Sequence, residues 1–320
     1  MKDLSFTSAS VFPAKLLKRN ILDNGGRIMP VHLQISPTNK CTLSCSFCSC
    51  SARDKKLQLS LEDIKQIMDS AALAGTKAVT ITGGGEPLCH KNIKEIITHI
   101  ASLGIKIGLV TNGTIVHVLN SEDWSKVTWC RISSGDFRKW TDKYEARLQG
   151  AIDAGPNVDW AFSHVLGSKP NIELIKNLME FAKLNNFTHI RVVSDLLDLD
   201  NVPPMEDIEK QLADIDYPHM IYQGRKDSTP GTKKCLISLL KPVVGTNGKL
   251  YPCCGTQYAQ AEPSKDFGQP IMTMGDAKDI KDIYDKQKCF DGSICKTCYY
   301  SNYNWALEVM TEDITHEDWV

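Results

Sequence analysis

Residues 31–48 read VHLQISPTNKCTLSCSFC, and this stretch determines how the rest of the chain is interpreted. Residues 31–36 alternate apolar and polar side chains with β-branched residues among them, which predicts a strand. Three cysteines follow within eight residues, at Cys41, Cys45 and Cys48. Thiolates are the soft ligands that suit iron-sulfur clusters and zinc. We therefore expect a metal centre in the loop after the first strand.

Strand-like and helix-like segments alternate downstream of this loop. The pattern predicts further strands over 78–82, 105–111, 129–133, 159–165 and 190–193. Helices are expected over 60–75, 93–103, 144–154 and 172–184. Six such units are too few for a closed eight-stranded barrel. The sequence therefore predicts an α/β fold, an open partial (β/α)6 TIM-like barrel, with functional residues at the carboxyl ends of its strands.

A change in pattern marks the end of this barrel. Pro203-Pro204 and a loop-rich stretch from Tyr217 to Lys234 interrupt the helical periodicity. Between two short apolar runs, Asn247-Gly248 predicts a hairpin turn. We expect four parts, namely an N-terminal extension (1–30), the barrel (31–216), a small cysteine-rich domain (217–302) and an acidic tail (303–320).

Composition restricts the possible partners and compartment. The formal net charge is −1, which provides no general attraction to nucleic acid or to an anionic membrane. No apolar run reaches the roughly 18 residues of a membrane span, and no signal-peptide pattern opens the chain. We therefore expect a cytoplasmic protein that binds neither nucleic acid nor membrane. Its twelve cysteines are then expected to be metal ligands, because disulfides rarely persist in a reducing compartment.

The C-x3-C-x2-C spacing, with Phe47 just before the third cysteine, resembles the signature of the radical S-adenosylmethionine (SAM) superfamily. The resemblance implies that Cys41, Cys45 and Cys48 hold a 4Fe-4S cluster. Three ligands leave one iron open, and in this family that iron binds the amino and carboxylate groups of SAM. An electron from the cluster then cleaves SAM to a 5'-deoxyadenosyl radical.

Other segments resemble the SAM contacts of this family. Gly84-Gly85-Glu86, after the second strand, is similar to the motif that holds the SAM amino group. Asn112, after the third strand, and Ser133, on the fourth, match positions that contact SAM. A glycine-rich connection or an Asn-Gly turn can also be purely structural. Alternation places Cys130 on the face opposite Ser133, so we expect Cys130 to pack among the helices.

A second group of cysteines follows the expected boundary. Its arrangement resembles the twitch form of the SPASM-type auxiliary domain, which carries one auxiliary cluster. The resemblance implies that a second 4Fe-4S cluster is held by Cys235, Cys253, Cys295 and Cys298. A zinc ribbon is the alternative, since four cysteines ending in a C-x2-C pair also suit zinc. Cys289 could replace one ligand, and Cys254 is unassigned.

The resemblance implies an enzyme, a radical SAM oxidoreductase that abstracts a hydrogen from a small molecule or a peptide. Net oxidation would follow if the auxiliary cluster accepts an electron. Two alternatives stay open, an epimerase that uses a cysteine thiol as hydrogen donor and a non-enzymatic zinc-binding module. The candidate donors are Cys50, Cys89 and Cys254. A flavodoxin or ferredoxin is the expected reductant.

Overall fold

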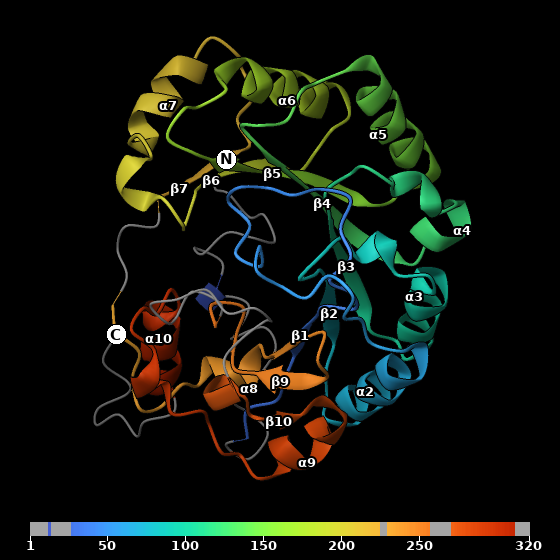
Figure 1. Ribbon diagram of the computed structural model, residues 1–320, viewed down its shortest axis with the longest axis vertical. Coiled ribbons are helices and arrows are strands. Elements are labelled where there is room, and N and C mark those ends of the chain that lie inside the picture. Colours follow the sequence, from blue (N-terminus) through green and yellow to red (C-terminus); the bar gives the residue numbers. More distant parts are fainter. Residues whose placement is uncertain (1–11, 14–26, 225–228, 257–269, 311–320) are drawn as a thin grey trace, which may run out of the picture.

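The structure is a computed structural model that describes residues 12–13, 27–224, 229–256 and 270–310. Within these ranges, ten strands form one open sheet in the order β10-β9-β8-β1-β2-β3-β4-β5-β6-β7. The strands curve into an arc with helices on its outer side (Figure 1). The strands are β1 (His32–Ile35), β2 (Ala78–Ile81), β3 (Lys106–Thr111), β4 (Val127–Gly135), β5 (Asp159–Leu166), β6 (His189–Ser194), β7 (Met220–Gln223), β8 (Val243–Val244), β9 (Lys249–Tyr251) and β10 (Gly275–Asp276).

The α-helices that cover the outside of the arc follow the strands in turn. They are α2 (Leu61–Leu73), α3 (Ile93–Ser102), α4 (Ser121–Trp124), α5 (Asp142–Ala154), α6 (Ile172–Leu184) and α7 (Met205–Leu212). Three more lie in the last third of the chain, α8 (Ile237–Leu240), α9 (Ile280–Asp285) and α10 (Ser301–Met310). Ser60 caps α2 by accepting a hydrogen bond from the backbone N–H of Asp63, and Gly75, with φ +97°, follows its end.

The predicted open α/β barrel is confirmed, and the structure adds a seventh parallel strand. β7 pairs with β6, and it lies beyond residue 217, where the barrel was expected to end. Pro204 stands at the start of α7 rather than in a linker, which is a position that proline tolerates because the first helical N–H groups have no intrahelical partner. The barrel sheet therefore continues across the expected boundary.

The predicted hairpin forms from β8 and β9, and it extends the same sheet. Val243 and Val244 pair in parallel with Gln34 and Ile35 of β1. β9 runs antiparallel to β8 and pairs with β10. The cysteine-rich segment is therefore joined to the barrel along the edge of β1.

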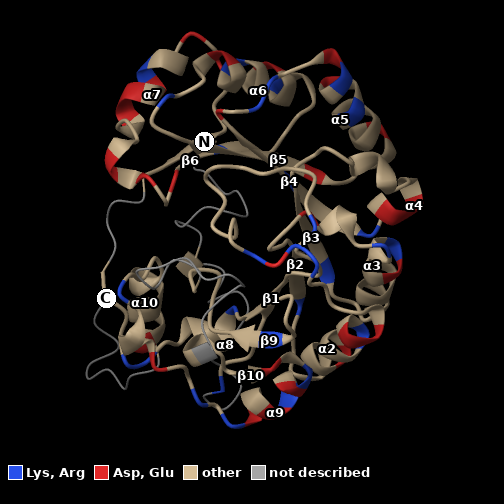
Figure 2. Cartoon of the chain, in the orientation of Figure 1, with Lys and Arg blue, Asp and Glu red and all other residues tan. Residues whose placement is uncertain are grey.

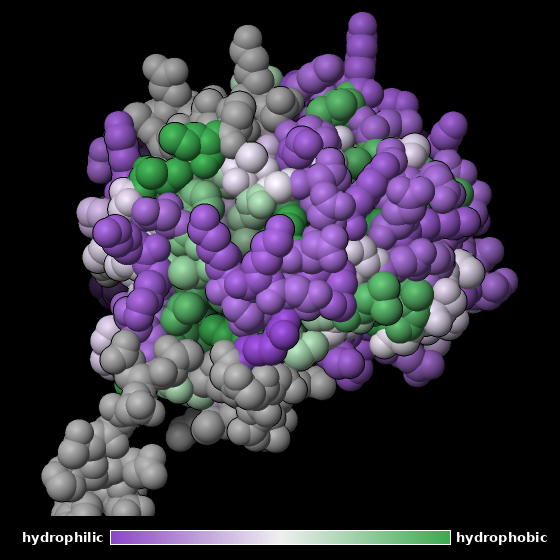
Figure 3. Space-filling model, turned by 90° about the horizontal axis from the view of Figure 1, so that it is seen from below, coloured by the Kyte–Doolittle hydropathy of each residue, from purple (hydrophilic) through white to green (hydrophobic). Residues whose placement is uncertain are grey.

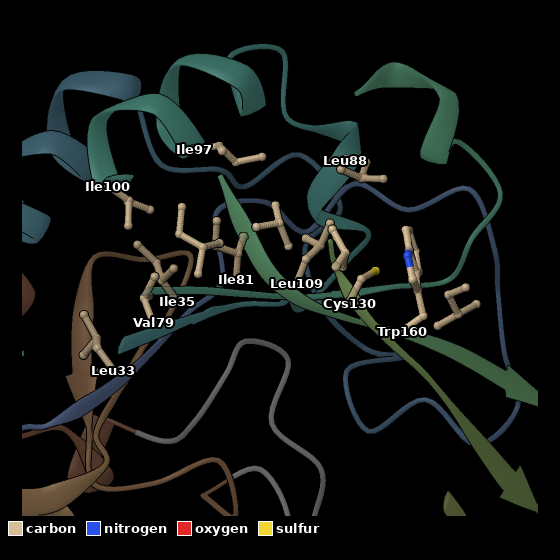
Figure 4. Packing of buried hydrophobic residues seen from close by; sticks show 14 of the residues in the cluster. Leu33, Ile35, Val79, Ile81, Leu88, Ile97, Ile100, Leu109, Cys130 and Trp160 are labelled. Atoms are coloured by element: carbon tan, nitrogen blue, oxygen red, sulfur yellow. The ribbon is translucent and has the colours of Figure 1, made fainter. Parts of the chain in front are cut away.

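The core lies between the outer face of the sheet and the helices. Leu33, Val79, Ile81 and Leu109 are at most 1% exposed. They point from the strands toward Ile97 and Ile100 of α3 (Figure 4). Cys130 is fully buried in the same layer, as predicted from strand alternation. The opposite side chains of each strand face the inside of the arc, where the site lies.

Lys, Arg, Asp and Glu residues are frequent on the helices outside the arc (Figure 2). The face seen in Figure 3 is mostly hydrophilic, with apolar side chains in small groups. Among the described residues, no helix combines the length and apolar composition needed to cross a membrane. Most of the expected extension (1–30) lies outside the described ranges, as do residues 311–320. The first part of the expected acidic tail (303–320) falls within α10.

Candidate functional site

The cysteine loop begins at the carboxyl end of β1 and lies inside the arc of strands (Figure 1). Backbone hydrogen bonds from Cys48 to Cys45, from Ser51 to Cys48 and from Arg53 to Cys50 fold it into consecutive turns. The loop brings Cys41, Cys45 and Cys48 to the wall of one cavity of about 240 Å³. The other walls are the carboxyl ends of β2 to β6, as expected for a site at this end of the barrel.

The thiols of this loop are crowded. Burial, followed by the charges of the neighbouring Cys48 and Cys41, raises the pKa of Cys45 to about 11. Thiolates so placed repel one another unless a cation lies among them. Among the described residues, no three His, Cys, Asp or Glu side chains converge on a point that suits one metal ion. Cysteines that hold a multi-iron cluster each bind a different iron, so they need not converge in this way.

The glycine-rich turn after β2 packs directly against the cysteine loop. The backbone N–H of Gly85 donates to the carbonyl of Thr38 (3.0 Å), and that of Glu86 donates to the carbonyl of Lys40 (2.7 Å). A Cβ atom on Gly85 would lie 2.1 Å from the Lys40 carbonyl oxygen. Only glycine permits the two backbones to approach so closely.

Glu86 joins the ends of β2 and β3. Its side chain accepts hydrogen bonds from the Thr111 hydroxyl (2.7 Å) and from the backbone N–H groups of Asn112 (2.7 Å) and Leu88 (3.1 Å). Burial raises the pKa of Glu86, and these hydrogen bonds oppose the increase. The carboxylate was expected to meet the SAM ammonium, and the structure directs it to these protein donors.

The remaining expected SAM contacts lie on the same cavity. Asn112 donates from Nδ2 to the Thr42 hydroxyl (3.0 Å) and lies 3.7 Å from Cys41 Sγ. Phe47 packs so closely on Gly135 that a Cβ atom there would lie 2.2 Å from the ring. All the residues that were expected to contact SAM line this cavity: Phe47, Gly84, Gly85, Glu86, Asn112 and Ser133.

Two buried arginines near the cysteines were missed by the sequence analysis. Arg53 is 7% exposed, lines the cavity and donates toward Cys48 Sγ (3.3 Å). Arg138 is 8% exposed and stacks over the Tyr144 ring, with 4.8 Å from Cζ to the ring centroid. Both arginines lie in loops that follow strands, next to other charged residues in the sequence. Such charged runs usually indicate solvated loops. The sequence contains no spacing signal that separates them from such loops.

The three candidate hydrogen donors occupy different places. Cys50 lines the cavity and is 3% exposed, and burial raises its pKa to about 12. Cys89 belongs to a short 3-10 helix (Pro87–Cys89) and is not part of the cavity wall. Cys254 lies with its Sγ 2.8 Å from the Tyr300 hydroxyl. The structure therefore brings Cys50, and neither Cys89 nor Cys254, to the first cavity.

The second cysteine set surrounds a smaller cavity of about 20 Å³. The backbone N–H of Cys298 donates to Thr229, and that of Cys235 donates to Phe290, so segments far apart in sequence meet here. Burial and neighbouring thiols raise the pKa of Cys235 to about 12 and that of Cys295 to about 11. The cavity wall includes all four predicted ligands: Cys235, Cys253, Cys295 and Cys298. Cys254 and Cys289 are outside it.

The contact between the glycine turn and the cysteine loop generates a stability prediction. Gly85→Ala should lower the free energy of unfolding by about 1–3 kcal/mol, because the added methyl meets rigid backbone. Gly150→Ala is the matched control, since its Cβ meets no atom within 4 Å on α5. It should raise the free energy of unfolding by about 0.5–1 kcal/mol through helix propensity. Urea unfolding measures both, and equal effects would contradict the proposed close approach.

Comparison with known proteins places this geometry in a family. Residues 35–127 match the model of the radical SAM superfamily. The probable GTP 3',8-cyclase of Pyrococcus horikoshii is 39% identical over 101 residues, which are 31% of this chain and 32% of that protein. The probable GTP 3',8-cyclase of Methanothermobacter marburgensis is 26% identical over 264 residues, covering 70% of this chain and 84% of that protein. The match thus spans about a third of the Pyrococcus relative and most of the Methanothermobacter one.

The fold extends the similarity over nearly the whole chain. Streptococcus suis SuiB, solved in complex with its precursor peptide SuiA, aligns with a TM-score of 0.59 and 17% identity, covering 92% of this chain and 75% of SuiB. The matched family model includes the cysteine loop, the glycine-rich turn and Asn112. Residues 35–127 are therefore identified as a radical SAM domain, a type of domain that uses a 4Fe-4S cluster and SAM.

Proposed function

We propose that Cys41, Cys45 and Cys48 hold the cluster of this radical SAM enzyme and that the cavity beside them binds SAM. The observation that carries the proposal is that the three cysteines and all the expected SAM contacts line one cavity. Thiolates match the donor chemistry of an iron-sulfur cluster. The glycine turn forms part of the wall of the same cavity. When bound, the cluster supplies the electron that cleaves SAM to a 5'-deoxyadenosyl radical.

The protein's own residues then position SAM. Cys41, Cys45 and Cys48 would hold the cluster through three of its irons, which would leave one iron for the amino and carboxylate groups of SAM. The Ser133 hydroxyl and the Asn112 amide present hydrogen-bonding groups along the cavity wall. Glu86 acts indirectly, because its bonds to Thr111 and Asn112 hold the end of β3 against the glycine turn.

This assignment predicts the metal content and the basal reaction. Anaerobically purified protein should contain iron and acid-labile sulfide, and with dithionite it should convert SAM to 5'-deoxyadenosine. Cys45→Ala should lower 5'-deoxyadenosine formation at least 100-fold, as judged by liquid chromatography, because a cluster ligand is lost. Cys89→Ser is the matched control and should keep the wild-type rate, since Cys89 is not on the cavity wall. Zinc without sulfide would instead favour a zinc-binding module.

We infer that residues 217–302 supply an auxiliary 4Fe-4S cluster, held by Cys235, Cys253, Cys295 and Cys298. The four thiols line the second cavity, which supports the set chosen from the sequence. Cys289 is a weaker candidate for a ligand because it is not on that wall. A cluster with four cysteine ligands is suited to electron transfer, and it would provide an acceptor for an electron from the substrate.

The auxiliary assignment predicts a selective loss of iron. The double variant Cys295→Ala/Cys298→Ala should retain about half of the wild-type iron, because one of two 4Fe-4S clusters is lost. It should still cleave SAM, since the first cavity is unchanged. Cys289→Ala is the matched control and should keep the full iron content. A wild-type iron content in the double variant, or the loss of half of the iron in Cys289→Ala, would overturn this choice of ligands.

For the reaction as a whole we propose net two-electron oxidation of a small molecule or a peptide. Both substrate classes occur among the similar proteins, since the sequence relatives are named for a reaction of GTP and SuiB was solved with a peptide. A flavodoxin or ferredoxin is the proposed reductant. Epimerisation is the second candidate, because Cys50 is buried on the cavity wall where a thiol could return a hydrogen.

A labelling experiment separates the two reactions. Protein is incubated with SAM, dithionite and each candidate substrate, beginning with GTP, in deuterated water. Oxidation should give a product two hydrogens lighter without carbon-bound solvent deuterium, as measured by mass spectrometry. A product of unchanged composition that carries one deuterium, lost in Cys50→Ser, would overturn the oxidation proposal and support the epimerase.

A further inference from the structure

A buried guanidinium lies between the cysteine loop and the glycine turn. Arg53 donates from Nη1 to Cys48 Sγ (3.3 Å) and to the carbonyl of Cys50 (2.6 Å). It donates from Nε to the carbonyl of Asn39 (3.0 Å). The side chain therefore makes contact with a predicted cluster ligand and with the backbone on both sides of it.

The surroundings of Arg53 fix its position. Asn39 is itself held, since its Nδ2 donates to the carbonyl of Asp54 (3.0 Å). Gly84 covers the pair, because a Cβ atom there would lie 2.0 Å from Asn39 Oδ1 and 3.6 Å from Arg53 Cδ. Only 7% of Arg53 is exposed, so most of the side chain is shielded from solvent.

The charge of Arg53 is directed at sulfur. Among the residues that the structure describes, no Asp or Glu forms an ion pair with Arg53. Its guanidinium instead donates to Cys48 Sγ (3.3 Å). A buried cation is costly unless an anion lies beside it. Thiolates bound to iron would supply that anion.

We propose that Arg53 is a positioning residue that sets the reduction potential of the cluster through its hydrogen bond to Cys48. The inference rests on the cluster assignment proposed above. Reduction adds negative charge to the cluster and its sulfurs. An N–H donor and a fixed positive charge stabilise that added charge, so they make reduction easier. Cleavage of SAM depends on this electron, so Arg53 would influence the first step of the reaction.

The test is a redox titration of the SAM-site cluster, followed by electron paramagnetic resonance. At a fixed solution potential, Arg53→Gln should lower the ratio of reduced to oxidised cluster at least tenfold, a shift of about 59 mV for one electron. Arg53→Lys keeps the charge but cannot span all three acceptors. Its ratio of reduced to oxidised cluster should therefore fall between those of the wild type and Arg53→Gln. Lys56→Gln is the matched control, because it removes the same charge from an exposed side chain of the same loop. Its ratio should equal that of the wild type.

A second measurement reports the hydrogen bond itself. Electron-nuclear double resonance of the reduced wild-type cluster should show a proton coupling that disappears in deuterated water and is weakened or lost in Arg53→Lys. If Arg53→Gln fails to retain iron, Arg53→Lys decides, and an unchanged ratio with an unchanged coupling overturns the inference. A wild type without iron and sulfide overturns the proposed function as well. A wild type with a cluster that does not respond to either variant overturns this inference alone.

Discussion

The whole site depends on the contact between two backbones, where Gly85 and Glu86 donate hydrogen bonds to the carbonyls of Thr38 and Lys40. This contact fixes the start of the cysteine loop on the end of β2. A side chain at Gly85 would separate the two segments, and the cavity wall would then lose its shape. Glu86 extends the connection to β3, because its carboxylate accepts from Thr111 and Asn112. Three strand ends are thus held at fixed distances from the cysteines by only a few hydrogen bonds.

β1 is the element that relates the two cysteine sets. The carboxyl end of β1 leads into the first cysteine set. The edge of β1 that does not pair with β2 pairs with β8, and the hairpin of β8 and β9 leads to Cys253. A separate auxiliary domain on a flexible linker would allow the two centres to vary in distance. Here both are attached to one sheet, so the distance between them is set by the strand spacing and by the turns that follow. Fixed geometry of this kind would suit electron transfer between the two proposed clusters.

Much of this arrangement could be predicted from the sequence because it depends on local signals. Strand and helix periodicity gave β1 to β6 and α6, and Ser60 and Gly75 gave the ends of α2. The cysteine spacing selected the first three thiols, and the structure puts them on one cavity. What could not be predicted depends on tertiary contacts. β7 is only four residues long after a polar loop, and the pairing of β8 with β1 joins segments far apart in the chain. Arg53 looks like part of a solvated charged run until its burial and its three acceptors are known.

The parallel pairing of β8 with β1 also determines the order in which the protein can fold. During synthesis, β1 emerges early, and Val243 and Val244 are made far later, so one edge of β1 lacks this partner in the interval. At ordinary rates of translation this interval is on the order of 10 s or more. Unpaired strand edges promote aggregation, and the cysteine loop beside this edge would be open to oxidation in the same period. Protection of the first cysteine set and completion of the sheet would therefore be linked in time as well as in space.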